Sequence, residues 1–383
     1  MYPYESFLQE SNQILQNLSD DFAYYLLYLD FTDFQMVNHF YGMEAGDSLL
    51  RAMEEALKRD PQVRTCVNIF SDQFLCLIQT EKDVDVEKII ISYQQRSRLF
   101  LEEQGTNYPL CTLKLSCGIC KVTGGNLKYA VDGANLARKE AKRRGSLRAF
   151  PYSDAMQKQM TDQYELERAV NDSLREERFL FYLQPKVDLE TGRTIGAEAL
   201  ARRVGRDGSI IYPDAFLSVM EANGSIVELD MLIYRKVCAF LADRREKGLP
   251  VVQTSVNLSR LHIHNPETAD IIHSVAQAYE IPSDLLEFEL TETILLDEFS
   301  GAKQLIDRLR AYGYRVSIDD FGSGYSGINI WQELNFDVLK LDKKFLSTKK
   351  ELVYRNEAIV PNMINIAQRL HVQVLCEGVE TEE

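Results

Sequence analysis

The sequence predicts two domains, an α+β domain followed by an α/β barrel. The chain has 383 residues, and at about 150 residues per domain this length suits two or three domains. In the first half, helical segments are interspersed with strand-like runs that include a hairpin pattern. In the second half, short β-runs alternate with helical stretches, as in parallel strands joined by crossover helices. So many repeats of this unit favour a barrel.

The first domain is expected at residues 21–152, after a leader helix at 1–20. The predicted elements are a buried strand at 24–29, a helix at 45–57, hairpin strands at 64–69 and 74–78, a helix at 84–101, a strand at 110–122 and a helix at 127–144. Continuous apolar runs indicate the strands, and apolar residues on one face indicate the helices. The hairpin turn at 70–73 lacks the usual glycine. Residues 153–178 are polar and favour helix, which predicts a connecting helix.

The second domain is expected at residues 179–383. Its predicted strands are 179–184, 194–200, 251–258, 285–291, 314–319, 336–341 and 372–377. A barrel left open after these strands would expose the backbone of its edge strands. We therefore expect that the barrel is truncated at the C-terminus and lacks its last strand.

Composition narrows the classes of partner. The net charge is −15, from 58 acidic and 43 basic residues. A negative charge of this size repels nucleic acid polymers. An anionic substrate would therefore need a metal ion or a placed cation in its binding site. No run approaches the roughly 20 apolar residues of a membrane span, and the N-terminus lacks a signal-peptide pattern. Seven cysteines, mostly in apolar runs, predict buried thiols in a cytoplasmic protein without a membrane partner.

Polar side chains gather at the ends of the predicted strands, where barrel enzymes place their active sites. In chain order these are Glu198, Asn257, Glu289, Glu292, Asp319, Asp320, Lys340, Glu377 and Glu380. Carboxylate and amide oxygens suit Mg²⁺ or Mn²⁺ rather than zinc. The adjacent Asp319 and Asp320 could serve two ions, which together can activate water for attack at phosphorus. Any one of these acids alone would be interpreted as a solvated side chain, so the prediction depends on the set.

The same segments resemble a known family. Residues 196–202 (GAEALAR) resemble the signature of the EAL family of cyclic di-GMP phosphodiesterases. Further matches are residues 182–185 (YLQP), 255–259 (SVNLS), 289–292 (ELTE), 319–326 (DDFGSGYS), 340–342 (KLD) and 377–380 (EGVE). The series covers about 179–383 in order, and no single tripeptide would suffice. The family's closing segment and last strand would lie beyond Glu383.

This resemblance implies a TIM-like barrel that hydrolyses one phosphodiester bond of cyclic di-GMP to give linear pGpG. Two Mg²⁺ or Mn²⁺ ions are implied, held by Glu198, Asn257, Glu289, Asp319 and Asp320. Glu377 would act as a base or as a ligand of the second metal, and Lys340 would orient the water. Gln184, Leu200 and Arg202 would contact the dinucleotide. Glu292 and Glu380 would support the loop at 321–326.

The first half resembles a degenerate GGDEF domain, which implies a nucleotide-cyclase-like fold. Asp30, Asn38 and Asp47 occupy positions that carry metal and guanine contacts in that family. The signature hairpin instead reads FSDQF at 70–74, and Thr32 replaces an acid. Side chains in place of the two glycines obstruct close approach of the backbone to a triphosphate. We therefore expect no cyclase activity. Asn38 and Asp47 allow weak GTP binding, or they hold a turn and cap a helix.

Two functions remain open at this point. The first is a cyclic di-GMP phosphodiesterase with an inactive GGDEF domain for regulation or dimerisation. The alternative is a receptor that binds cyclic di-GMP without cutting it and signals to a protein partner. Receptors of this family usually lose metal ligands, whereas every ligand position is filled here, which favours the enzyme. The family also implies a homodimer.

Overall fold

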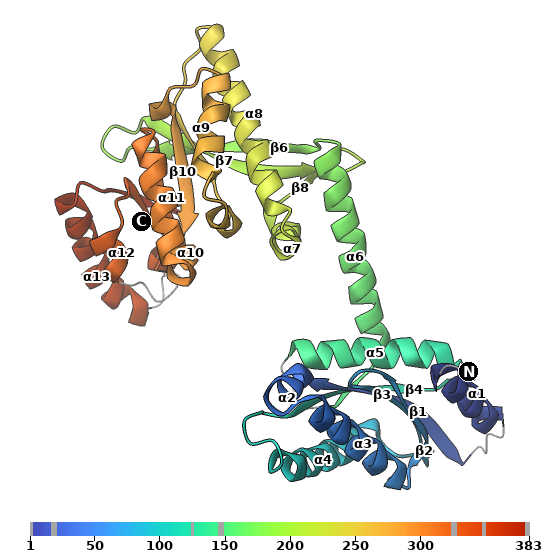
Figure 1. The fold of residues 1–383 in the computed structure, drawn as a ribbon. Helices are drawn as coiled ribbons and strands as arrows, with labels where there is room; N and C mark the ends of the chain where they lie inside the picture. Colours follow the sequence, from blue (N-terminus) through green and yellow to red (C-terminus); the bar gives the residue numbers. More distant parts are fainter. Residues whose placement is uncertain are drawn as a thin grey trace. The chain divides into compact units, whose positions relative to one another are not determined.

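The computed structural model describes residues 3–16, 21–123, 126–144, 149–322, 328–346 and 350–379. The chain divides into two compact units, Met1–Asp162 and Gln163–Glu383, called the first and second units below. Figure 1 shows an α+β arrangement in the first unit and a curled sheet with helices against it in the second.

The first unit is built on a five-stranded sheet of order β2-β3-β1-β4-β5. Its strands are β1 (Phe22–Thr32), β2 (Val63–Phe70), β3 (Gln73–Glu81), β4 (Lys114–Lys121) and β5 (Ala149–Pro151), and its helices are α1 (Pro3–Gln16), α2 (Phe34–Tyr41), α3 (Met43–Arg59), α4 (Val86–Gly105) and α5 (Leu127–Arg143). Central strand β1 is apolar on both faces because both are covered. Leu27 and Leu29 lie in one core with residues of α3 and α4, and Leu26 lies in another with residues of α1 and α5.

Most elements of the first unit were predicted. The β2–β3 hairpin is antiparallel, as expected, and Ser71 adopts a left-handed φ of 50° at the turn that lacks glycine. Two elements were missed, the eight-residue α2 and the three-residue β5. Both are too short to produce a clear periodic pattern. Helix α3 begins at Met43, with Gly42 as its N-cap. The alternative that Asp47 caps a helix is therefore wrong, because Asp47 lies inside α3.

Helix α6 (Asp154–Arg175) leads into the second unit. The strands of this unit are β6 (Phe179–Val187), β7 (Thr194–Val204), β8 (Ile210–Ile211), β9 (Gln253–Asn257), β10 (Leu286–Thr291), β11 (Arg315–Phe321), β12 (Val338–Leu341) and β13 (Gln373–Cys376). All seven predicted strands are present, in the order β13-β12-β11-β10-β9-β7-β6, and β8 pairs with β7. Among the described strands the sheet is open, with β6 and β13 at its edges.

Helices pack against the sheet of the second unit (Figure 1). They are α7 (Leu217–Asn223), α8 (Ile226–Glu246), α9 (Thr268–Ala278), α10 (Glu292–Asp297), α11 (Phe299–Ala311), α12 (Ile328–Glu333) and α13 (Lys350–Arg369), with short 3₁₀ helices at Pro213–Ala215, Arg260–His264, Ser283–Leu285 and Lys343–Leu346. The strands from β7 to β13 along this order are parallel. One expectation was wrong, since β6 pairs with β7 in antiparallel fashion. The link at residues 188–193 is too short for a crossover helix, so the chain turns back as a hairpin.

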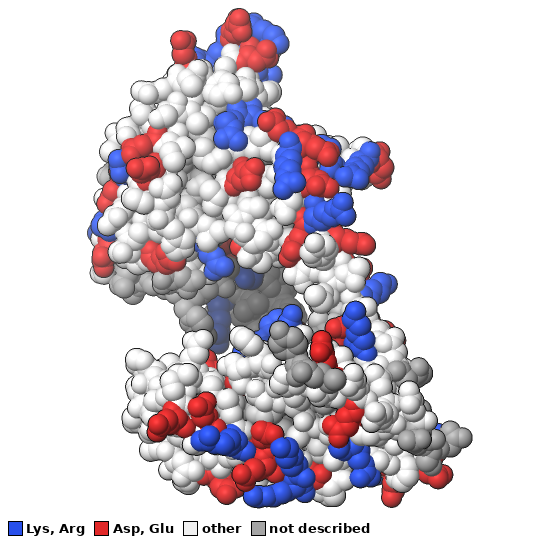
Figure 2. Space-filling view, turned by 45° about the vertical axis from the view of Figure 1, so that its right-hand side comes forward, with Lys and Arg blue, Asp and Glu red and all other residues white. Residues whose placement is uncertain are grey.

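Surface charge is mixed. Figure 2 shows acidic and basic side chains close together on the face it presents, without a broad basic patch. Among the described residues, no helix combines the length and the apolar character needed to cross a bilayer.

Candidate active site

Lys340 lies at the centre of a buried carboxylate cluster. It is the third residue of β12, and its side chain is fully buried. Its Nζ lies 2.9 Å from Glu198 Oε2, 3.0 Å from Asp319 Oδ2 and 2.8 Å from Glu377 Oε1, and it also donates to Glu289 Oε2. The four acids come from β7, β10, β11 and the end of β13. Parallel pairing thus gathers acids that are far apart in sequence around one ammonium group.

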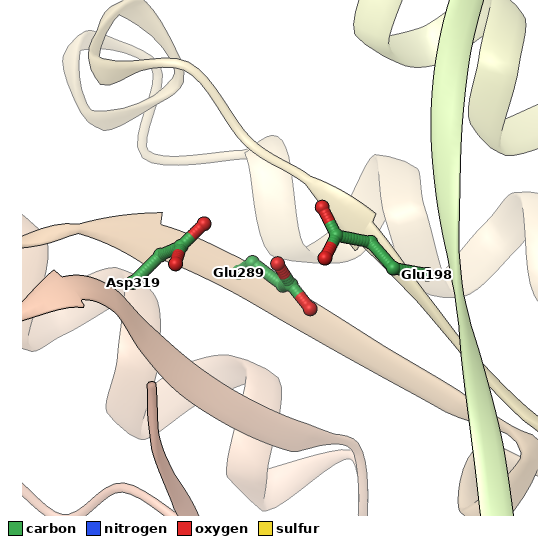
Figure 3. A group of neighbouring side chains, drawn as sticks. All are labelled: Glu198, Glu289 and Asp319. Carbon is green, nitrogen blue, oxygen red and sulfur yellow. The ribbon is translucent and has the colours of Figure 1, made fainter. Parts of the chain in front are cut away.

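Three of these carboxylates converge closely enough to share a metal ion. Figure 3 shows Glu198, Glu289 and Asp319 directed toward one another. One ligand oxygen from each lies within 4.8 Å of the others, and Asp319, Asp320 and Glu377 form a second such group. Asn257 donates from Nδ2 to Glu198 Oε1 over 3.0 Å. The donor set is all oxygen, which fits a hard divalent cation.

The electrostatics also favour an added cation. The pKa of Asp319 is raised to about 6, because burial and the Glu289 and Glu377 carboxylates together outweigh the lowering effect of Lys340. Burial and Glu289 likewise raise the pKa of Glu198. Burial also acts to raise the pKa of Glu289, but the Lys340 and Lys186 ammonium groups outweigh it and lower that pKa. Lys340 alone does not compensate the acids around it, so a divalent ion would stabilise their charged forms.

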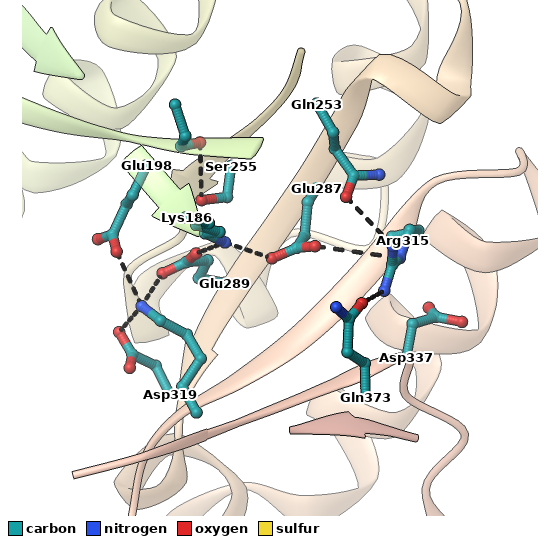
Figure 4. Close-up of polar contacts among 12 residues, drawn as sticks. Lys186, Glu198, Gln253, Ser255, Glu287, Glu289, Arg315, Asp319, Asp337 and Gln373 are labelled. Carbon is teal, nitrogen blue, oxygen red and sulfur yellow. Dashed lines mark hydrogen bonds and ion pairs between the residues drawn. The ribbon is translucent and has the colours of Figure 1, made fainter. Parts of the chain in front are cut away.

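A second layer of charges lies behind the cluster and was missed by the sequence analysis. Lys186 Nζ donates to Glu287 Oε1 over 2.7 Å and to Glu289 Oε1 over 2.9 Å (Figure 4). Arg315 lies 4.0 Å from Glu287 and donates to Gln373 over 2.8 Å. The available signal was strand alternation, because Lys186 lies two residues after Gln184 and so shares its face of β6.

Strand β11 has unusual backbone geometry at Asp320, where its register with β12 shifts between Ile318 and Phe321. Asp320 has a φ of 55°, and its backbone nitrogen donates to Asp319 Oδ1 over 2.8 Å. Aspartate tolerates this left-handed conformation better than most residues. Glu292 Oε2 accepts a hydrogen bond of 2.8 Å from the backbone nitrogen of Gly322, at the start of the predicted loop. Residues 323–326 of that loop and Glu380 lie outside the described residues.

Two pockets meet at the carboxylate cluster. One has a volume of about 550 Å³ and includes Asn257 and Asp320, and the other has a volume of about 500 Å³ and includes Gln184, Glu198 and Glu377. Leu200 and Asp319 line both. The site therefore offers two compartments joined at the acids.

Arg202 differs from the other predicted contacts because it lines neither pocket. Its guanidinium carbon lies 5.4 Å from the ring centre of Tyr182 and 4.9 Å from that of Tyr212. Both aromatic faces thus hold the side chain by cation–π contact at the edge of the site.

The first unit places Asp30 in an ion-pair network. Asp30 is 2% exposed and accepts hydrogen bonds from Arg138 and from Lys142, the latter over 3.2 Å. Its negative charge is therefore already compensated by two cations of α5. Asn38 Oδ1 is buried without a hydrogen-bond partner among the described residues, and its side chain lies against Gly46. Asp47 is exposed on α3.

Comparison with known families accounts for both units. Residues 167–383 match the EAL domain family, and residues 4–148 match the family described as diguanylate cyclase, GGDEF domain.

Curated relatives match most of this chain. Cyclic di-GMP phosphodiesterase NbdA of Pseudomonas aeruginosa is 27% identical over 94% of this chain and 46% of its own length. The bifunctional diguanylate cyclase/cyclic di-GMP phosphodiesterase MucR of the same organism is 26% identical, over 96% of this chain and 54% of its own. The chain spans about half the length of the curated relatives it matches.

Solved structures agree with this fold. The PaMucR phosphodiesterase in complex with c-di-GMP is 28% identical, with a TM-score of 0.52 over 57% of this chain and 88% of that one. The S helix-GGDEF-EAL structure of Vibrio cholerae LapD is 17% identical, with a TM-score of 0.51 over 98% of this chain and 88% of that one. At that identity LapD supports the tandem fold alone.

Proposed function

The chain belongs to the EAL domain family, and from this premise we propose that its second unit hydrolyses cyclic di-GMP to linear pGpG. Family membership and the relatives support a role in cyclic di-GMP signalling. The observation that carries the proposed hydrolysis is the convergence of Glu198, Glu289 and Asp319 where two pockets meet. A receptor would need the pockets but not this set of carboxylates.

The oxygen donors support Mg²⁺ or Mn²⁺ as the cofactor. Glu198, Asn257, Glu289 and Asp319 would hold one ion, and Asp319 and Asp320 would contribute to a second. Bound ions would supply positive charge that stabilises the phosphate in the transition state.

The chain's own side chains would direct the proton transfers. Lys340, held by the carboxylates around it, would donate a hydrogen bond to the attacking water and orient it. Glu377, the most exposed acid of the cluster, would accept the proton of that water. The water oxygen forms a bond to phosphorus, the bond from phosphorus to the 3′ oxygen breaks, and that oxygen takes up a proton.

The pockets provide room for the two guanosine halves. Gln184 and Leu200 would contact the dinucleotide from the pocket walls. Arg202 would reach it only after leaving its contacts with Tyr182 and Tyr212. Glu292 would support the loop that follows Phe321 through its bond to Gly322.

The first unit is proposed to make no cyclic di-GMP. Its Asp30 is bound by Arg138 and Lys142, and Gln73 of the hairpin accepts a hydrogen bond of 2.8 Å from the Tyr28 hydroxyl. These contacts support a regulatory or dimerisation role over catalysis. GTP binding at Asn38 and Asp47, a homodimer and a cytoplasmic location remain predictions.

The direct test is to mix the purified chain with cyclic di-GMP and Mg²⁺ and to resolve the products by liquid chromatography. We expect pGpG to form and its formation to stop when a chelator is added. Glu198→Gln should also form no pGpG, because it keeps the shape of the side chain but removes its charge. Glu228→Gln, which changes an exposed acid of α8 in the same way, should hydrolyse normally. Binding of cyclic di-GMP without pGpG would support the receptor instead.

A second variant tests the proposed pair of ions. Asp320→Asn removes one carboxylate from the group of Asp319, Asp320 and Glu377 while keeping the residue's size and its tolerance of a left-handed φ. We expect hydrolysis to fall by at least about 100-fold, roughly what a positioned catalytic group contributes, with the dissociation constant for cyclic di-GMP little changed in calorimetry. Near-normal turnover in this variant would rule out a role for Asp320 in the reaction.

A further inference from the structure

Arg203 is a buried cation that has no partner for its charge within the described part of the chain. It lies on β7, five residues after Glu198, so its side chain is on the opposite face from that acid. Arg203 is 9% exposed, and its Nε is buried without a hydrogen bond. Among the described residues no hydrogen bond or ion pair reaches its guanidinium group. Buried charges are normally paired because their desolvation is costly, so this arginine points to an acceptor supplied from outside the chain.

Arg203 lines a pocket with a volume of about 530 Å³. The pocket, here called the α6–β7 pocket, is lined by Glu165, Arg168, Ala169 and Asp172 of α6, by Arg178 and Arg203, and by Gly205, Arg206, Asp207, Ser209 and Ile211 near β8. It shares no residue with the two pockets at the carboxylate cluster. It is therefore a separate compartment of the second unit, and its volume is in the range of small-molecule sites.

The acids near the α6–β7 pocket do not compensate Arg203. Asp172 pairs with Arg206 over 3.2 Å. Asp207 accepts hydrogen bonds from the backbone and hydroxyl of Ser209, over 3.0 Å and 2.6 Å. Glu165 is exposed and forms no ion pair with Arg203 among the described residues.

The neighbouring arginine adds to the unfavourable charge. Arg178 donates to the carbonyl oxygen of Val204 over 2.9 Å and pairs with Glu176 over 2.6 Å. Burial and the nearby charge of Arg178 lower the pKa of Arg203. Arg203 therefore lies beside a like charge without an acid of its own.

We propose that the α6–β7 pocket binds a phosphate-bearing small molecule whose phosphate oxygens accept hydrogen bonds from Arg203. Guanidinium groups match phosphate oxygens in geometry. A doubly charged group suits two neighbouring arginines better than a singly charged carboxylate does. A lone phosphate would leave most of the pocket empty, which favours a larger phosphorylated molecule. This site is independent of the proposed hydrolysis.

The test uses the full chain in buffer freed of metals by a chelating resin, with pyrophosphate as the probe. We expect saturable binding in calorimetry, at least about tenfold weaker in Arg203→Met, as expected for loss of a charged hydrogen bond. Arg235→Met, which removes an exposed arginine of α8, should bind like the parent. Absence of saturable binding, or equal binding by Arg203→Met, would overturn the proposal. So would acetate at matched ionic strength binding as tightly as pyrophosphate.

Stability provides a second measurement that needs no ligand. Without an anion, Arg203→Met should be at least as stable to urea as the parent, because it removes an unpaired buried charge and keeps an unbranched side chain. Pyrophosphate should then stabilise the parent but not the variant. If the variant is instead clearly less stable without an anion, Arg203 has an acceptor within the chain and the proposal is wrong.

Discussion

At the scale of single residues, Lys340 shows how one cation can hold an acidic site together. Its ammonium group contacts carboxylates from four separate segments, and it has no exposure to solvent. These contacts raise its pKa against the effect of burial. The lysine therefore stays charged at neutral pH, where it balances part of the charge of the acids before any ion binds.

We expect Lys340→Met to lower the free energy of unfolding by about 3–5 kcal/mol, the usual cost of removing one partner from a buried ionic group. Urea unfolding in metal-free buffer measures this change. Added Mg²⁺ should recover part of the loss, because it supplies the missing positive charge. The matched control is Lys247→Met, whose exposed pair with Asp243 should contribute no more than about 1 kcal/mol. Equal effects of the two variants would contradict this account of the cluster.

At the scale of elements, Gly118 allows α5 to lie directly on β4. A Cβ atom at this position would overlap the carbonyl oxygen of Ala134 and the backbone nitrogen of Arg138, both in α5. The same helix delivers Arg138 to Asp30 of β1. Close approach at one glycine thus sets the position of the helix and, through it, of the ion pair.

Gly118→Ala should therefore destabilise the first unit by about 1–3 kcal/mol, because added volume in a packed interior forces the backbone to shift. The clash is with backbone atoms, which cannot rotate away as a side chain could. Denaturant unfolding followed by circular dichroism measures the change. Gly105→Ala is the control, because nothing lies within 4 Å of a Cβ added there. A Gly118→Ala protein as stable as this control would show that α5 does not depend on that contact.

At the scale of the whole molecule, the two units have separate cores, so we expect two unfolding transitions. Lys340→Met should identify the transition of the second unit and Gly118→Ala that of the first. Mg²⁺ should raise the unfolding midpoint of the second unit only, because an ion bound to the folded state stabilises that state. A chelator should reverse this shift. Calorimetry measures the midpoints of both transitions. A shift in the transition sensitive to Gly118→Ala would place an ion in the first unit instead.

The sequence by itself determined the order of the longer elements and the residues at the strand ends. Glu289 and Asp319 were predictable because each lies near the carboxyl end of a predicted strand, and the carboxyl ends of parallel strands meet at one edge. The antiparallel β6–β7 pair could also have been predicted, since the nine residues between the predicted strands at 179–184 and 194–200 are too few for a crossover connection. These are local properties, in which a residue's role follows from its near neighbours.

Only the tertiary structure decided which charges are paired. Lys186 contacts Glu289 across 103 positions and Arg138 contacts Asp30 across 108. Arg203 lies buried near other charged side chains, and no acid among the residues that the structure describes pairs with it. No local sequence pattern predicts which of these charges are paired, because the pairing depends on strand register and on how helices pack over the sheet. Pairing a buried charge requires a partner within a few ångströms, and only the folded backbone brings such distant residues that close.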